Sequence, residues 1–319
     1  MQLSAPRHVP ARPHRPAQLS APRRRDARAA AAAPAAAALG RRAVLGLAAA
    51  PCCCAGCGRR WAWYDSWFAL NMAAGMADYE HAVAPLKAAL FERLLRGARA
   101  DSAADVPLQL LEVGIGTGPN LRHLRHLGGS VAVTGLEPNP AMWPYAREAA
   151  AAAGLGEQQL ALVAGDATAL PFEAGRFDVA VITLVLCSLP GEGPRRALDE
   201  VLRVLRPGGQ LLVVEHVAAP ELGWLRAQQA LLDPLQQLLA DGCHLTRRTD
   251  ALLRSSGFGP SSAGGGGAAV PQTRVDGVAG ATAAVAGGGP AGEGLLAFEV
   301  EGMGLIAPHV AGVLRAPLT

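Results

Sequence analysis

One stretch, LQLLEVGIGTGPN from Leu108 to Asn120, most limits what this chain can fold into. It begins with an apolar run of strand length and then places Gly114, Gly116 and Gly118 before a helical pattern at 121–127. A strand, a tight turn and a helix start in this order let backbone N–H groups approach a ligand closely, beside the positive end of the helix. An ordinary glycine-rich turn is the alternative, because the chain has 38 glycines.

Strand and helix patterns alternate after this stretch. That alternation predicts an α/β fold, doubly wound, with a mostly parallel sheet and helices on both of its faces. The sequence at 295–315 then predicts an antiparallel hairpin about a Gly302-Met303-Gly304 turn, which makes a seven-stranded sheet. We expect the parallel strands at 108–113, 131–136, 160–164, 177–183 and 210–215, and helices at 140–153, 194–205, 224–239 and 249–256.

Residues 1–58 differ in composition from the rest of the chain. They hold nine Arg and a single acid, Asp26, and are rich in Ala and Pro, which is typical of an organelle transit peptide. Arg41-Arg42 before a short apolar run resembles a twin-arginine signal, and a plain alanine-rich presequence is the alternative. We expect a chloroplast protein associated with the thylakoid, with the mitochondrion as the alternative location.

Charge and cysteine content exclude other classes of function. Residues 59–319 carry 20 basic and 25 acidic groups, so they offer no basic surface for nucleic acid. Four of the six cysteines fall at 52–57, with no second Cys or His pair at zinc-ligand spacing, so we expect no metal site. Cys187 and Cys243 are far apart in sequence and indicate no disulfide framework.

Two further pieces flank the sheet pattern. Residues 59–106 are aromatic-rich with helical periodicity, which predicts an N-terminal helical cap. The cap could cover the ligand pocket, anchor at a membrane surface, or simply pack on the core. Residues 259–294 contain 12 Gly and hardly any large apolar side chain, which favours a flexible insertion.

Acidic residues follow the second and third predicted strands, where open α/β sheets bind their ligands. Glu137 can accept hydrogen bonds from both ribose hydroxyls of a nucleoside cofactor, although it could also be a surface acid. Asp166 can accept from an adenine amino group while the N–H of Ala167 reaches a ring nitrogen, and a helix cap is the alternative for Asp166. A nicotinamide dehydrogenase would share the glycine turn and an acid, but the RPGG turn at 206–209 fits it poorly.

In this order the motifs resemble those of the class I S-adenosylmethionine (SAM)-dependent methyltransferases. The likeness rests on Glu112-x-Gly-x-Gly-x-Gly, Glu137, Gly165-Asp166-Ala167, Phe177-Asp178-Val179 and Leu205-Arg-Pro-Gly-Gly209. It implies a Rossmann-like methyltransferase domain at 107–319 with SAM as the cofactor. The cofactor-binding residues that it implies are Glu112, Gly114, Gly116, Gly118, Glu137, Asp166, Ala167 and Thr183.

Within this superfamily, the segments ITLVLCS, VEHV and DGCHLTR are similar to the methyltransferase-like 7 family. Its members are membrane-associated, and the characterised ones methylate small thiols. The likeness covers about 108–258 and resumes at Pro308-His309. The family's hydrophobic N-terminal anchor is replaced here by the presequence and the Trp-rich segment, and the insertion at 259–294 is extra.

The expected chemistry is in-line displacement at a sulfonium methyl group, which depends mainly on alignment and exclusion of water. His216 and His244 are the candidate catalytic residues on the acceptor side, with a structural role as the alternative for each. Cys187 could line the pocket or be buried and inert. Arg247 could pair with an acidic acceptor or with Asp241.

We therefore expect methyl transfer to a small, apolar acceptor, with a thiol as the first choice. C- or O-methylation of a prenylquinone or related lipid is the alternative within the same enzyme class. A non-catalytic, cofactor-binding protein at a membrane surface is the alternative from a different class. The expected partners are the acceptor itself and, by peripheral contact, a membrane, with no nucleic acid.

Overall fold

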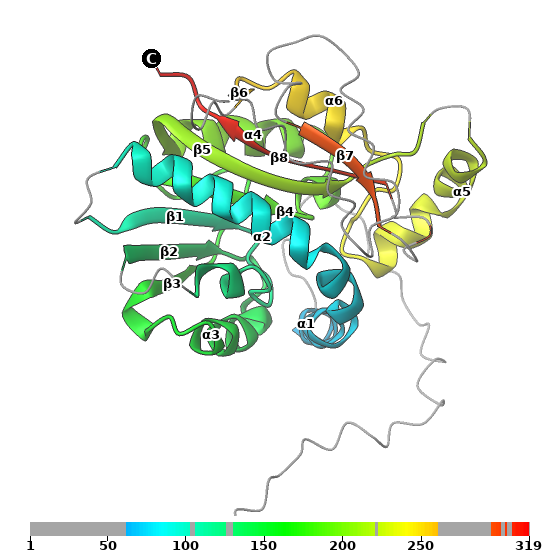
Figure 1. Cartoon of the computed structure of the whole chain (residues 1–319). Helices are drawn as coiled ribbons and strands as arrows, with labels where there is room; N and C mark the ends of the chain where they lie inside the picture. The colour runs from blue at the N-terminus through cyan, green and yellow to red at the C-terminus, as the bar shows by residue number, and fades with distance from the viewer. Residues whose placement is uncertain are drawn as a thin grey trace, which may run out of the picture. The chain divides into compact units, whose positions relative to one another are not determined.

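A computed structural model describes the following residues: 62–102, 106–125, 130–220, 223–260, 295–300, 304 and 308–318 (Figure 1). The predicted presequence at 1–58 lies outside these ranges, as does the predicted insertion apart from its first two residues.

A single sheet forms the centre of the described chain (Figure 1). Its strand order is β3-β2-β1-β4-β5-β8-β6, with β7 paired to β8 beside β6. The first five strands are parallel, and β8 runs antiparallel to β5. The strands are β1 (Leu108–Val113), β2 (Val131–Leu136), β3 (Leu160–Val163), β4 (Phe177–Thr183), β5 (Leu205–His216), β6 (Gly259–Pro260), β7 (Leu295–Glu299) and β8 (Pro308–Arg315).

The predicted doubly wound sheet with its C-terminal antiparallel hairpin is confirmed, and the short β6 adds an eighth strand. β5 begins earlier than expected. Leu205 already pairs with Phe177, and pairing resumes at Gln210 with Val179. The RPGG segment is therefore an irregularity within the strand, whereas the sequence predicted a turn before it.

Helices cover both faces of the sheet because successive strand residues point to opposite sides. On one face, α2 and α3 pack with η1 over side chains such as Leu110 and Val179. On the other face, α4 and α6 pack over alternate side chains such as Leu111 and Ala180. The α-helices are α1 (Ala62–Gly75), α2 (Ala77–Ala100), α3 (Trp143–Ala152), α4 (Gly193–Val204), α5 (Trp224–Leu239) and α6 (Thr249–Arg254); short 3-10 helices are η1 (Leu121–Leu124), η3 (Pro140–Met142), η4 (Glu157–Gln159) and η5 (Leu186–Ser188).

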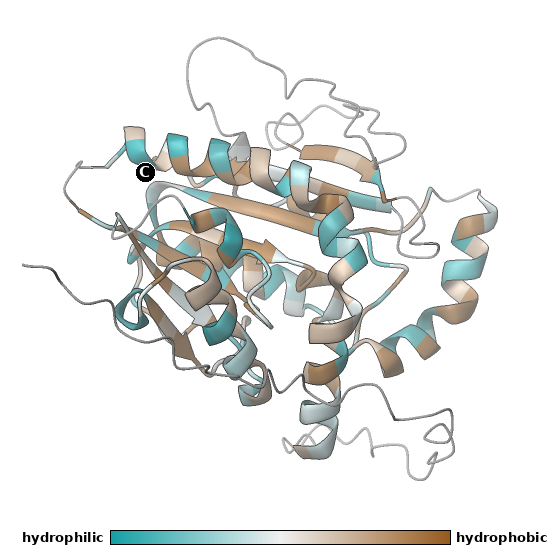
Figure 2. Cartoon of the chain, turned by 60° about the horizontal axis from the view of Figure 1, so that its bottom comes forward, coloured by the Kyte–Doolittle hydropathy of each residue, from teal (hydrophilic) through white to brown (hydrophobic). Residues whose placement is uncertain are grey.

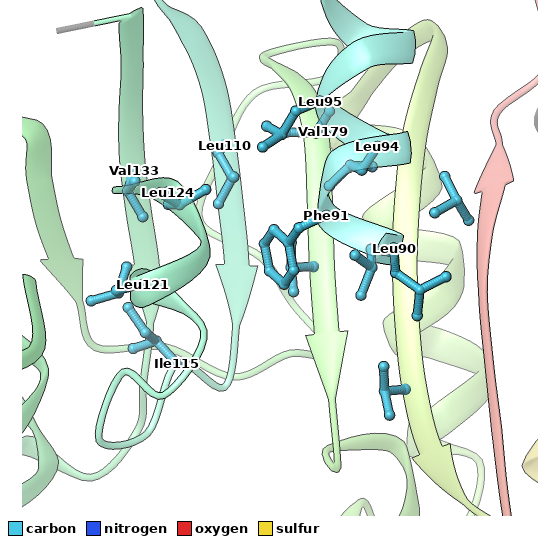
Figure 3. Close-up of a cluster of buried hydrophobic side chains, with 14 of the residues drawn as sticks. Leu90, Phe91, Leu94, Leu95, Leu110, Ile115, Leu121, Leu124, Val133 and Val179 are labelled. Carbon is cyan, nitrogen blue, oxygen red and sulfur yellow. The ribbon is translucent and has the colours of Figure 1, made fainter. Parts of the chain in front are cut away.

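The helical cap predicted at the N-terminal end consists of two helices with different positions: α2 packs on the core, and α1 lines the cavity. α2 packs on the sheet through Leu90, Phe91 and Leu94, whose side chains point toward the strands in Figure 3. This helix also buries Lys87, whose Nζ pairs with Glu80 Oε1 at 2.7 Å, as a buried charge requires. α1 instead reaches the ligand cavity described below.

The helix α5 contains many apolar residues (Figure 2), and several of their side chains are exposed. Its exposed side chains include Trp224 and Leu231, which are 79% and 78% accessible. In the described parts of the chain, none of the helices has the length and apolar character needed to cross a membrane. Peripheral membrane contact stays a prediction, and α5 presents a surface that could make it.

Candidate active site

A cavity of about 940 Å³ opens at the carboxyl ends of the parallel strands. It lies where the strand order reverses between β1 and β4, which is the point at which open α/β sheets bind ligands. Its size falls within the usual range for small-molecule sites. Its lining includes Phe68, Met72, Met76, Glu80, Gly114, Ile115, Gly116, Thr117, Glu137, Asn139, Asp166, Ala167, Thr183, Leu184, Val185, Ser188, Leu189 and Asp241.

The glycine turn after β1 forms one wall of this cavity. Gly116 has φ +55°, a conformation that L side chains rarely adopt, and the space beside it is open. At Gly114, in contrast, a Cβ atom would lie 2.4 Å from Val185 Cγ2. Gly114 also has a positive φ, +67°, so backbone conformation favours glycine at both positions, and at 114 packing against Val185 adds a second requirement.

Glu137, at the end of β2, holds this turn. Its Oε2 accepts a hydrogen bond from Gly116 N at 3.0 Å, and its Oε1 accepts from Asn139 N at 2.9 Å. The residue is 7% exposed and lines the cavity. A buried carboxylate fixed by two backbone donors can still accept hydrogen bonds from ligand hydroxyls through its remaining lone pairs.

Asp166 and Ala167 line the cavity after β3. Asp166 Oδ1 accepts from both the backbone N and the Oγ1 of Thr168, at 2.8 and 2.9 Å. These bonds close a local turn, whereas the sequence allowed a helix cap as the alternative.

Six of the eight predicted cofactor-binding residues line the cavity, and Glu112 and Gly118 do not. Glu112 is buried, and its Oε1 accepts from Asn120 Nδ2 at 2.8 Å. The same Asn120 amide donates to Thr183 Oγ1 at 3.0 Å. Gly118 has φ +78°, and a Cβ there would meet Leu121 Cδ1 at 2.9 Å. Glu112 and Gly118 therefore support the glycine turn without lining the cavity.

Burial sets the protonation of Glu112. Removal from water raises its pKa to about 7, although the hydrogen bond from Asn120 acts in the opposite direction. The carboxyl therefore changes its ionisation near neutral pH, which makes the stability of the protein depend on pH.

Sequence reasoning missed Glu215, near the end of β5. Its Oε1 accepts from the backbone N–H groups of Val185 and Leu186 at 2.7 and 2.9 Å. Burial raises its pKa to about 7, against the effect of these hydrogen bonds. Glu215 thus fixes the loop after β4, of which Val185 lines the cavity. The position of Glu215, an acidic residue near the end of a predicted strand, is the sequence feature that could have indicated this role.

Two residues of the cavity wall have unusual backbone conformations. Leu184 and Asp241 are the non-glycine residues with positive φ in the described chain, at 56° and 50°. Both line the cavity. Strain of this kind persists where the surrounding structure enforces it, and it is common at functional sites.

The two candidate catalytic histidines are not among the residues that line the cavity. His216 Nε2 lies 2.9 Å from Cys243 Sγ, and burial lowers the pKa of His216 to about 4. His244 Nδ1 lies 3.4 Å from Asp233 Oδ2. Each histidine contacts a partner that is also outside the lining, and a catalytic role for either one stays a prediction.

Cys187 and Arg247 also lie behind the wall. Cys187 is buried and does not line the cavity. Arg247 Nη1 donates to the carbonyl oxygens of Leu186 and Leu189, at 3.0 and 2.6 Å. Arg247 therefore holds the loop that carries Cys187.

Residues 111–213 match the family model of a methyltransferase domain. This match runs from within β1 to within β5, the part of the chain that carries the glycine turn, Glu137 and Asp166. Fold, site and match together define a class I SAM-dependent methyltransferase.

Human thiol S-methyltransferase TMT1A is 35% identical over 199 residues, which cover 62% of this chain and 78% of that protein. This chain therefore belongs to the family of TMT1A, which confirms the resemblance drawn from the motifs. The ubiquinone/menaquinone biosynthesis C-methyltransferase UbiE of Roseobacter denitrificans is 41% identical over 113 residues, or 35% of this chain and 44% of that protein. A SAM-dependent methyltransferase structure from Methanosarcina mazei aligns with TM-score 0.46 and 21% identity, covering 67% of this chain and 94% of that one.

Proposed function

We propose that this methyltransferase transfers the methyl group of SAM to the sulfur of a small, apolar thiol. The observation that carries the proposal is the relationship to human thiol S-methyltransferase TMT1A. The composition of the cavity wall supports it, because polar groups from the strand ends share one cavity with apolar side chains from α1.

The polar part of the cavity fits SAM. The N–H groups of the glycine turn, the Glu137 carboxylate and the Asp166 carboxylate offer donors and acceptors of the kind a nucleoside needs. When bound, SAM supplies an electrophilic methyl group on a positively charged sulfur. We assign Gly114, Gly116, Glu137, Asp166, Ala167 and Thr183 to its binding.

The apolar part fits the acceptor. Phe68, Met72 and Met76 approach the cavity from α1 and the residue after it, and Leu189 approaches from the loop after β4. These side chains would bury an apolar acceptor and exclude water, and flexible Met side chains tolerate acceptors of different shape.

When bound, SAM would supply the methyl group to the thiolate sulfur of the acceptor and would leave as a neutral thioether. The thiol proton goes to solvent before transfer. A free thiol has a pKa of about 8.5, so only a few per cent is ionised at pH 7. Because no histidine lines the described cavity, we expect the rate to rise with pH toward the pKa of the acceptor thiol.

The second candidate function is C-methylation of a quinone ring. It is favoured by the likeness to UbiE, which covers less than half of either chain. The apolar part of the cavity could also receive a quinol ring.

The test supplies radiolabelled SAM with equal amounts of an alkyl thiol and a demethylated quinol. Label on the thiol sulfur supports the proposal. Label only on the quinol ring would move the assignment to C-methylation. Measured SAM binding without labelled product from either acceptor would contradict both and favour the non-catalytic alternative.

A further inference from the structure

Three potential metal ligands meet behind the cavity wall, although the sequence indicated no metal site. Cys187 follows β4, His216 ends β5, and Cys243 lies in the turn after α5. Their ligand atoms all lie within 4.8 Å of one another, and all three residues are buried. Spacing in the sequence could not show this group, because its members come from three separate segments.

The donor set has the character that zinc prefers. Zn²⁺ binds thiolate sulfur and imidazole nitrogen in tetrahedral sites, with metal–ligand distances of about 2.0–2.3 Å. His216 presents Nε2 to Cys243 Sγ at 2.9 Å, and both cysteines are free thiols rather than a disulfide. A disulfide between the two cysteines would need no imidazole nitrogen beside the sulfur atoms, whereas a zinc site would use it as a ligand.

The charges of the proposed ligands also fit a metal site. Two thiolates and one divalent cation are neutral together, which offsets the cost of burying these charges.

We propose that Cys187, His216 and Cys243 bind one Zn²⁺ ion, whose fourth position takes a water molecule or a thiolate. The ion would join the segments that shape the cavity wall. Ser188 lines the cavity next to Cys187, and Asp241 lines it two residues before Cys243. The backbone already links these segments, because His244 N donates to Cys187 O at 2.9 Å. The site does not depend on which acceptor is methylated.

The test measures zinc in the full-length protein, purified under reducing conditions without chelators, by inductively coupled plasma mass spectrometry. We expect about one Zn²⁺ per chain. Cys187→Ser and Cys243→Ser should each remove most of it. Replacing Zn²⁺ with Co²⁺ should give the intense visible bands of a tetrahedral cobalt site and the near-ultraviolet sulfur-to-cobalt charge-transfer band.

Two control variants make the assignment specific. His244→Gln changes a histidine next to Cys243 that lies outside the cluster, so it should retain the metal. A variant with Ser at all four cysteine positions within 52–57 should also retain it, which separates this site from the N-terminal cysteines. Wild-type stoichiometry and the cobalt spectrum decide the question even if a site variant fails to fold.

Three results would overturn the proposal. The first is wild-type protein that contains no zinc and takes up none when reduced and supplied with it. The second is zinc that is lost in the 52–57 variant but kept in Cys187→Ser. The third is a Cys187–Cys243 disulfide, found by mass spectrometry as the predominant form of the freshly isolated protein.

Discussion

The carboxylate of Glu137 accepts a hydrogen bond from the backbone N–H of Gly116 at 3.0 Å. This bond joins the acid at the end of β2 to the glycine turn after β1, two features that the sequence identified separately. The acid therefore both holds the turn in shape and presents oxygen atoms to the cavity.

Replacing Glu137 with Gln tests its role in cofactor binding. The variant keeps one oxygen acceptor but loses the negative charge, and a hydrogen bond to a charged group contributes about 1.5–3 kcal/mol. We expect the Kd for SAM to rise roughly 10- to 100-fold, measured by calorimetry. Glu148→Gln, on the exposed surface of α3, is the matched control and should bind like wild type. Equal affinity in Glu137→Gln and wild type would exclude Glu137 from the cofactor site.

Glu112 should make stability depend on pH. Its pKa is about 7 in the folded protein and near its ordinary value of 4.5 when unfolded. The folded state therefore holds this proton more tightly, so the contribution of Glu112 to stability is largest below pH 4.5 and is lost as the pH rises to about 7. Glu112→Gln should remove this loss and stabilise the protein at pH 8 by at most about 3 kcal/mol, with little difference at pH 4.5.

Denaturant titrations across this pH range give the difference between Glu112→Gln and wild type. Glu215 contributes a similar slope to both proteins, so it cancels in the comparison. A difference that does not change with pH would show that the Glu112 carboxyl is not perturbed as described.

Met72 tests the acceptor side of the cavity. Met72→Ala removes apolar contact surface, and at about 25 cal/mol per Å² we expect the KM for the acceptor to rise roughly 5- to 30-fold. The Kd for SAM should stay the same. Leu70→Ala is the control on the same helix, because Leu70 is 59% exposed and does not line the cavity. A change in SAM affinity without a change in acceptor KM would place α1 at the cofactor instead.

The sequence was most informative where local pattern decides structure. β1, β2 and β4 have the predicted bounds, because each is an apolar run of strand length with turn residues at its end. The early start of β5 could not be predicted, since it depends on Leu205 pairing with Phe177, far away in the sequence.

In the candidate site, too, local sequence patterns were informative, whereas contacts between distant segments could not be predicted. Gly116 and Glu137 were predicted because their residue types and positions after strands are informative on their own. Nothing in the sequence shows that Asn120 donates a hydrogen bond to Glu112, or that Glu215 accepts hydrogen bonds from the backbone after β4. These roles depend on contacts between distant segments, which only the folded chain defines.

The central claim is that SAM binds in the cavity beside the glycine turn, and calorimetric titration of SAM into Gly116→Val tests it most directly. Gly154→Ala is the control, because Gly154 also has positive φ but has open space around it and does not line the cavity. Both variants place a side chain at positive φ, which costs about 1–2 kcal/mol for Ala and more for the β-branched Val, and only Gly116→Val places that side chain in the cavity. We predict that wild type and Gly154→Ala bind SAM while Gly116→Val does not; wild-type affinity in a folded Gly116→Val protein would contradict the account.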